Sequence, residues 1–249
     1  MFKKIIFTAL ILPLLFSISC AKERQGEVAF KITIDAPENS KNVRVWAPYP
    51  VSDKEQTISD IKVDGNFTRS EVYSQKQFPT DKALYAEWTK PTKTRFITLT
   101  FKAKAIERVR KDFPSKEFDI PIEIREYLKG SEFIPTDGKI KEIAVSITSG
   151  KKNILEKAEA AYDWVIENTF RDPNVQGCGI GDVERILVEK GGKCSDIGGL
   201  FVALARATGV PARQVWGLRL GKKQVEDMTG GHHCWTEVYL PSYGWIPVD

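Results

Sequence analysis

Hydrophobic and polar residues alternate along the first half of the chain. In Val28–Ile34, for example, every second residue from Val28 onward is large and apolar. Because side chains on a β-strand point to opposite faces in turn, this period of two predicts strands with one buried face. The predicted strands are Val28–Ile34, Val43–Trp46, Gln56–Val63, Ser70–Tyr73, Ala83–Trp88 and Arg95–Ala103. Short strands at this spacing are typical of a β-sandwich, so we expect a β-sandwich-like domain over residues 27–125.

The second half of the chain changes to the period of 3.6 residues that is typical of helices. A polar connector over residues 105–138 precedes it. The predicted helices are 140–147, 154–166, 183–190 and 197–208, and the predicted strands are 212–220, 233–240 and 245–249. Asn153 and Asp182 stand where they would cap the second and third helices, and Gly209 ends the fourth. Helices followed by an antiparallel sheet predict an α+β domain over residues 130–249.

The first 20 residues resemble a bacterial lipoprotein signal peptide. Lys3 and Lys4 precede an apolar run that is too short to span a membrane comfortably, and Cys20 follows that run. The resemblance implies export, lipidation of Cys20 and a membrane partner reached through that anchor. The location would be the periplasmic side of the outer membrane or the cell surface. Ser17 stands where the usual signal has leucine, so cleavage and secretion without a lipid is the alternative.

Composition and charge are those of an ordinary globular protein. Hydrophobic residues make up 42% of the chain and charged residues 28%, and 37 basic against 33 acidic residues leave a net charge of only +4. Nucleic-acid-binding proteins concentrate far more positive charge on one face or helix. We therefore expect no nucleic-acid partner.

Three cysteines remain after the signal segment: Cys178, Cys194 and Cys234. Disulfides are allowed outside the cytoplasm, and an odd number leaves at least one thiol unpaired or bridged to another molecule. Cys194 follows two glycines and a lysine, where the most apolar helix is about to begin. The free N–H groups and the dipole of a helix N-terminus stabilise a thiolate and can hold an oxyanion. From position alone, a buried structural cysteine explains Cys194 equally well.

The whole chain holds only two histidines, His232 and His233, and they are adjacent. A cysteine nucleophile needs a general base, so an imidazole base must be one of these two. Neighbouring residues of a strand point to opposite faces. We therefore expect only one histidine to face a given site.

Three segments of the second half resemble, in the right order, the motif blocks of the transglutaminase-like superfamily. These are Gly192-Lys193-Cys194-Ser195-Asp196 with its helix and Gly209-Val210-Pro211, then His233-Cys234-Trp235, and finally Tyr243-Gly244-Trp245 through Asp249. The resemblance covers residues 130–249 and implies a papain-like cysteine protease fold. It also implies a triad with Cys194 as nucleophile, His233 as general base and acid, and Asp249 orienting His233.

The same resemblance implies acyl transfer on amide bonds of a protein or peptide, through a thioester on Cys194 and without a cofactor. Water would resolve the thioester in hydrolysis of a peptide or isopeptide bond, and an amine would resolve it in transamidation. Family analogy favours hydrolysis without deciding the matter. The alternative from another class is a catalytically inactive binding or assembly module at the cell surface.

Three further side chains complete the predicted site. Gln176 is a candidate second donor to the oxyanion, beside the backbone N–H of Cys194. Cys178 and Cys234 leave two alternatives open, a disulfide that leaves Cys194 free or two reduced thiols that line the site. Zinc ligation by the three cysteines and one histidine fits no common zinc spacing, so we expect no metal.

The hairpin at the end of the sequence sets a geometric condition on Asp249. If residues 241–244 formed a four-residue loop, Leu240 would pair with Trp245, and Asp249 would face Thr236. That register puts Asp249 on the wrong side for His233, because side chains alternate between faces. The triad therefore requires a bulge or a loop with an odd number of residues.

Overall fold

The structure is a computed structural model that describes residues 22–75, 78–113, 119–219 and 221–249. The predicted signal peptide and Cys20 lie outside the described residues. Within the described ranges, no helix is both long and apolar enough to cross a membrane. The described chain divides into two compact units, one of residues 22–74 and 80–109, the other of residues 75–79 and 110–249.

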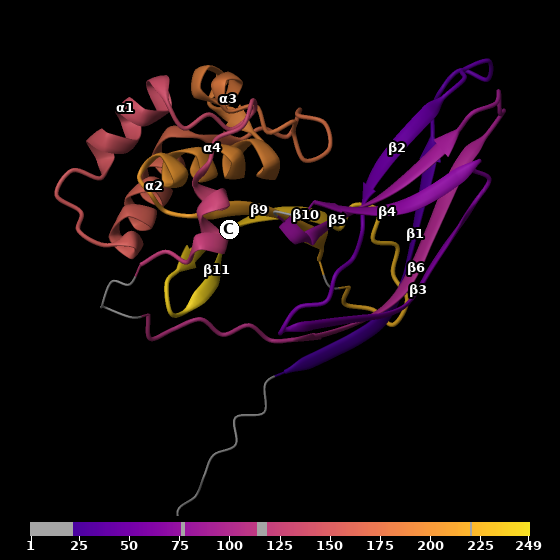
Figure 1. The fold of residues 1–249 in the computed structure, drawn as a ribbon, viewed down its shortest axis with the longest axis horizontal. Helices are drawn as coiled ribbons and strands as arrows, with labels where there is room; N and C mark the ends of the chain where they lie inside the picture. Colours follow the sequence, from indigo (N-terminus) through magenta and orange to yellow (C-terminus); the bar gives the residue numbers. More distant parts are fainter. Residues whose placement is uncertain (1–21, 76–77, 114–118, 220) are drawn as a thin grey trace, which may run out of the picture. The chain divides into compact units, whose positions relative to one another are not determined.

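The first unit is built from two three-stranded sheets, with the strand orders β1-β6-β3 and β2-β5-β4 (Figure 1). The strands are β1 Glu23–Ile34, β2 Val43–Pro48, β3 Gln56–Gly65, β4 Arg69–Gln75, β5 Phe78–Trp88 and β6 Arg95–Ile106. Leu84, Ala86 and Trp88 of β5 form a buried core with Ile97 of β6. Since β5 and β6 belong to different sheets, this core lies between the sheets, which confirms the expected sandwich-like domain.

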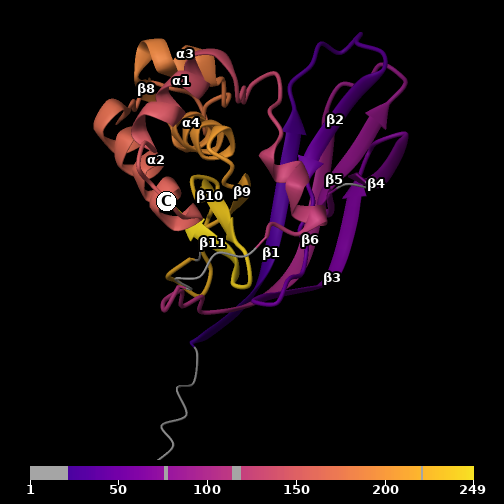
Figure 2. The same cartoon turned by 60° about the vertical axis from the view of Figure 1, so that its left-hand side comes forward.

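The second unit combines helices with a three-stranded antiparallel sheet of order β11-β10-β9, and this confirms the predicted α+β class. Its elements are η1 Ile122–Leu128, α1 Gly138–Ile147, α2 Ile154–Asn168, β7 Phe170–Arg171, α3 Val183–Glu189, β8 Gly191–Gly192, α4 Cys194–Ala207, β9 Ala212–Leu218, β10 His232–Leu240 and β11 Gly244–Val248. The sequence did not reveal η1 or the short parallel pair β7 and β8. Helices α1 to α4 gather on one side of the sheet (Figures 1 and 2).

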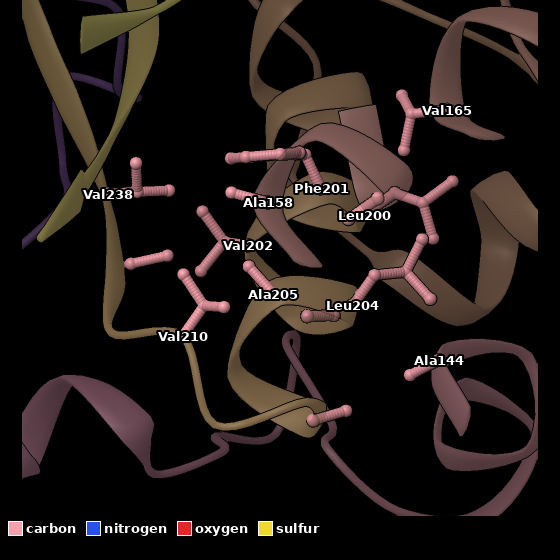
Figure 3. Close-up of a cluster of buried hydrophobic side chains, with 14 of the residues drawn as sticks. Ala144, Ala158, Val165, Leu200, Phe201, Val202, Leu204, Ala205, Val210 and Val238 are labelled. Atoms are coloured by element: carbon pink, nitrogen blue, oxygen red, sulfur yellow. The ribbon is translucent and has the colours of Figure 1, made fainter. Parts of the chain in front are cut away.

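Helix α4 is the centre of the second unit. Leu200, Val202 and Leu204 are fully buried, and α1, α2 and α3 pack around this helix. Figure 3 shows Val202 of α4 near Val238 of β10 and Val210, which follows the helix. A helix that is apolar on all sides is expected in the interior of a domain. The core therefore packs α4 against the sheet.

Two helices begin at the capping residues that the sequence predicts. The side chain of Asn153 accepts a hydrogen bond from the backbone N–H of Glu156 at 2.9 Å, and Asp182 caps α3 in the same way. Helix α4 begins at Cys194, three residues before the predicted start at Ile197. Its first turn is polar, so the hydrophobic period alone could not reveal it.

The two units divide after Val109, which lies inside the predicted connector but before the predicted boundary at residues 125–130. The reason is η1, whose residue Tyr127 is buried in the second unit. Its ring packs edge-on against Trp245 at 4.9 Å between centroids. The connector therefore contributes a structured segment to the α+β unit.

The hairpin of β10 and β11 has the odd loop that the sequence requires. Leu240 pairs with Gly244, so the loop holds three residues, 241–243. The N–H of Tyr243 donates to the carbonyl of Leu240 at 3.0 Å, and Ser242 has a φ of 66°. Proline at 241 followed by a residue with positive φ is typical of a type II turn. Thr236 consequently pairs with Val248, and Asp249 falls on the face of His233.

Candidate active site

Cys194 is the first residue of α4, so its thiol stands at the positive end of a 14-residue helix. The backbone N–H of Ser195 donates to the carbonyl of Cys178 at 2.8 Å. Within the described chain, no hydrogen bond occupies the backbone N–H of Cys194. That N–H is therefore available to an oxyanion formed beside the thiol.

Asp196 organises this helix start, and the sequence analysis did not assign it a role. It is fully buried, and its Oδ2 accepts from the N–H of Lys193 at 3.0 Å. Its Oδ1 accepts from the N–H groups of Ile180 and Gly181 and from Arg185 Nη2 at 2.7 Å. A carboxylate in the first turn of a helix is the usual signal for such capping. The carboxylate thereby joins the loop after Cys178 to the turn that carries Cys194.

The loop leaves no room for a side chain where it meets this carboxylate. A Cβ at Gly179 would come within 1.9 Å of Asp196 Oδ2, and Gly179 also has a φ of 86°. Both facts require glycine at this position. Close packing against Asp196 thus explains the glycine at position 179 of the glycine-rich segment.

The surroundings of Cys194 favour its thiolate form. Burial acts to raise the pKa of the thiol. The polar groups around the sulfur, first the backbone of Cys234 and then the thiols of Cys178 and Cys234, act in the opposite direction. The pKa of Cys194 is lowered overall. The deprotonated sulfur is the nucleophilic form of cysteine, so this environment activates it.

His233 and Asp249 form the second part of the predicted site. His233 Nε2 lies 2.8 Å from Asp249 Oδ2, and the His233 side chain is only 16% exposed. With Nε2 held by the carboxylate, Nδ1 is left to exchange a proton with a neighbouring group. The pair can form because the three-residue loop sets the register of β11 against β10.

Cys194 and His233 line the same open cleft, which has a volume of about 280 Å³. Its walls are Arg171, Gly177, Cys178, Lys193, Cys194, Arg219, Gly230, His232 and His233. Both histidines reach the cleft, although strand alternation predicted only one. They stand at the first two positions of β10, and His232 Nδ1 is tied to the carbonyl of Thr229 at 3.1 Å.

Gln176 is exposed and does not line this cleft. Its backbone carbonyl accepts from the N–H of Gly179 at 3.1 Å, which helps to shape the loop. The proposed contact of its side chain with an oxyanion therefore stays a prediction.

The three cysteines converge on one point although they are far apart in the sequence. The sulfur atoms of Cys178, Cys194 and Cys234 all lie within 4.8 Å of one another. No disulfide joins these three described cysteines in the structure. Both alternatives for Cys178 and Cys234, a bridge or two reduced thiols that line the site, stay predictions. Burial is the main reason that the pKa values of Cys178 and Cys234 are raised. Only Cys194 is activated.

Known proteins resemble both the sequence and the fold. Residues 141–249 match the family model of the transglutaminase-like superfamily. An uncharacterized protein of Haemophilus influenzae is 34% identical over 240 residues, which cover 86% of this chain and 65% of that protein. The uncharacterized protein YebA of Bacillus subtilis is 26% identical over 125 residues, 45% of this chain and 17% of YebA. The chain thus spans less than two thirds of the length of either relative.

A solved structure extends the likeness to nearly the whole chain. The crystal structure of a candidate cysteine protease from Cytophaga hutchinsonii matches with a TM-score of 0.63 and 19% identity. The match covers 92% of this chain and 78% of that one. At this low identity, the match establishes only that the two proteins share a fold. The family comes from the sequence match of residues 141–249. Residues 141–249 of this chain form a domain of the transglutaminase-like superfamily.

Proposed function

We propose that this protein is a cysteine-nucleophile enzyme that cleaves or exchanges amide bonds of a protein or peptide through a thioester. The observation that carries the proposal is the 2.8 Å contact between His233 Nε2 and Asp249 Oδ2, beside a cleft that His233 shares with Cys194. A nucleophile, a base within one cleft and a residue that orients the base are the three parts of a catalytic triad.

The chemistry follows from these parts. The Cys194 thiolate attacks the amide carbonyl and forms a carbon–sulfur bond, and the carbonyl oxygen becomes an oxyanion. The backbone N–H of Cys194 is positioned to donate to that oxyanion. His233, having taken the thiol proton, gives it to the leaving amine as the carbon–nitrogen bond breaks. Asp249 holds the imidazole ring in place and stabilises its charged form.

A second nucleophile then releases the acyl group. Water, deprotonated by His233, would yield an acid, whereas an amine would yield a new amide. We favour hydrolysis of a peptide or isopeptide bond, on family analogy. Residues 1–20 support export of the protein, and Cys20 is proposed as the site of a lipid anchor.

Capture of the thioester tests the proposal most directly. The protein is mixed with candidate peptides, quenched in acid and digested, and Cys194 is searched by mass spectrometry for an acyl adduct. An adduct is expected on Cys194, and Cys194→Ala is the control that should abolish it. Alkylation with iodoacetamide at neutral pH provides a substrate-free measurement. Slow labelling of every cysteine in the folded protein would contradict the proposal and favour a binding module.

A further inference from the structure

We propose that Cys178, Cys194 and Cys234 also form a three-thiolate site for a thiophilic metal ion of the zinc type, and that the bound ion blocks the nucleophile. The inference goes beyond the proposed function, because it concerns the cluster rather than the triad. It replaces the expectation of no metal, which depended on spacing along the chain and not on the distances between the sulfur atoms. The proposal depends on three sulfur atoms that lie within 4.8 Å of one another. One comes from a loop, one from a helix start and one from a strand.

The geometry needs little adjustment to hold an ion. Thiolates bind zinc at about 2.3 Å, so three of them around one ion stand roughly 4 Å apart. The present separations, at most 4.8 Å, shorten to this value by small side-chain rotations. Backbone contacts already hold the three segments together, since the N–H of Ser195 bonds the carbonyl of Cys178 at 2.8 Å. The site is therefore largely formed before any ion arrives.

The chemistry of the cluster selects the kind of ion. Thiolate ligands favour zinc and other soft cations over magnesium or calcium, which prefer oxygen. Cys234 is 1% exposed, so one side of the site is dry, while Cys194 opens onto the cleft. Binding would release the thiol protons and leave one coordination position toward the cleft. An ion bound there would coordinate the sulfur of Cys194, which the triad needs as its nucleophile.

Cadmium is the probe, because its bonds to thiolates absorb in the near ultraviolet. Titration of the full chain, reduced and kept free of oxygen, is expected to saturate at one ion per chain. Cys178→Ser and Cys234→Ser should each weaken binding at least tenfold and lower the absorbance by about a third. Cys20→Ser, which removes the only cysteine outside the cluster, is the matched control and should change neither quantity.

Two results would overturn the site: no thiolate absorbance at saturation, or full absorbance in either serine variant. The absorbance measurement requires no catalysis. Absence of metal binding would therefore not contradict the proposed enzyme, and absence of a thioester would not contradict the metal site. In the metal-loaded protein, alkylation of Cys194 should stop and should return when a chelator removes the ion. If the metal-loaded protein were alkylated at an unchanged rate, the ion would not be coordinated by the Cys194 sulfur.

A different observation supports a second inference, which rests on the proposed function: the structure assigns the cleft to substrates that carry a negative charge near the scissile amide. Arg171, Lys193 and Arg219 line the cleft, and within the described chain none of the three side chains has an ion-pair partner. No carboxylate is among the lining residues. A cleft lined by one sign of charge attracts ligands of the opposite sign.

The three cations come from separate segments that the fold brings together. Arg171 pairs with Gly192 in the short parallel ladder, and Lys193 immediately precedes Cys194. Arg219 follows β9, where its backbone N–H bonds the carbonyl of Gly231 at 2.8 Å. Convergence from three segments around one thiol favours an aspartate or glutamate side chain, or a terminal carboxylate, close to the reacting bond.

Two alkylating reagents of similar size measure this charge effect without a known substrate. Iodoacetate is an anion and iodoacetamide is neutral, so the ratio of their rates at Cys194 reports the field in the cleft. Arg171→Gln and Arg219→Gln should each lower the ratio about two- to fivefold, and added salt should shrink the difference. Arg44→Gln, an exposed arginine of the first unit, is the matched control. An unchanged ratio in both cleft variants would overturn the inference, while rapid labelling by iodoacetamide would leave the proposed nucleophile intact.

Discussion

The two faces of β10 serve different purposes within nine residues. One face carries Cys234, Thr236, Val238 and Leu240, each no more than 3% exposed, and it packs beneath α4. The other carries His233, Trp235, Glu237 and Tyr239, whose side chains take part in polar and ring contacts such as His233 with Asp249. Strand alternation thus separates a packed face from a face with polar and ring contacts, which includes His233.

Cys194, at the start of α4, has neighbours from both faces of β10. The backbone of Cys234 helps to lower the pKa of the Cys194 thiol, and the sulfur of Cys234 lies within 4.8 Å of the Cys194 sulfur. His233, one residue earlier, lines the cleft into which Cys194 opens. If this division is correct, substitutions on one face should lower activity and substitutions on the other should lower stability.

The largest expected effect is on the reactive face. His233→Ala should slow acyl transfer to Cys194 by about 10²- to 10⁴-fold, because the nucleophile loses its base and the leaving group its acid. The midpoint of thermal unfolding should stay nearly the same, since the imidazole does not belong to the core. Rates of thioester formation and a melting curve measure the two quantities. A large drop in the melting temperature would contradict the division between the faces.

The packed face should show the opposite response. Val238 is 2% exposed in the core beneath α4, so Val238→Ala leaves a cavity and should lower the free energy of unfolding by about 2 kcal/mol. Denaturant unfolding measures this loss. Alkylation of Cys194 in the fraction that remains folded should be unchanged within about twofold. A hundredfold loss of reactivity without unfolding would contradict the comparison.

Substitution of Asp249 should slow acyl transfer less than substitution of His233. Its side chain is 64% exposed, so water can replace part of the contact with the imidazole. We expect Asp249→Ala to slow acyl transfer about tenfold, and Asp249→Asn to fall between that variant and the unchanged protein. Rates of thioester formation for the two variants provide the test. A loss as large as that of His233→Ala would show that the carboxylate does more than orient the ring.

The smallest expected effect is a difference in pH dependence among the thiols. The pKa of Cys194 is lowered and that of Cys178 is raised, so the Cys194 thiolate should form first as pH rises. In the metal-free protein, alkylation near pH 7 should therefore be selective for Cys194, and Cys178 should be labelled only at higher pH. Mass spectrometry after brief labelling from about pH 6 to 10 gives the order. Labelling of Cys178 at the lower pH would contradict the assignment.

Local patterns predicted most of the elements, because each depends on neighbouring residues. The strands and the helix caps at Asn153 and Asp182 follow from spacing along the chain. The odd hairpin loop was predicted only because the expected triad required it or a bulge. The first turn of α4 was missed because Cys194, Ser195 and Asp196 carry no hydrophobic period. The start at Cys194 had to be inferred from the preceding glycines.

Patterns of neighbouring residues could not predict the contacts between segments that are distant in the sequence. The convergence of three thiols, the bonds of Asp196 to the loop of Gly181 and the basic lining of the cleft each join residues separated by 15 or more positions. Strand alternation also gave a wrong prediction for His232, which lines the cleft together with His233. A residue at the end of a strand can reach a neighbouring cleft whichever face it occupies.

The three-residue loop of the last hairpin has a consequence for how this domain can change over evolutionary time. Adding or removing one residue between Leu240 and Gly244 would turn every later side chain of the strand to the other face, and Asp249 with them. Adding two residues would restore the original facing. In proteins that use this hairpin for a histidine–carboxylate pair, we therefore expect loop lengths to differ by even numbers, unless a bulge elsewhere in the strand compensates.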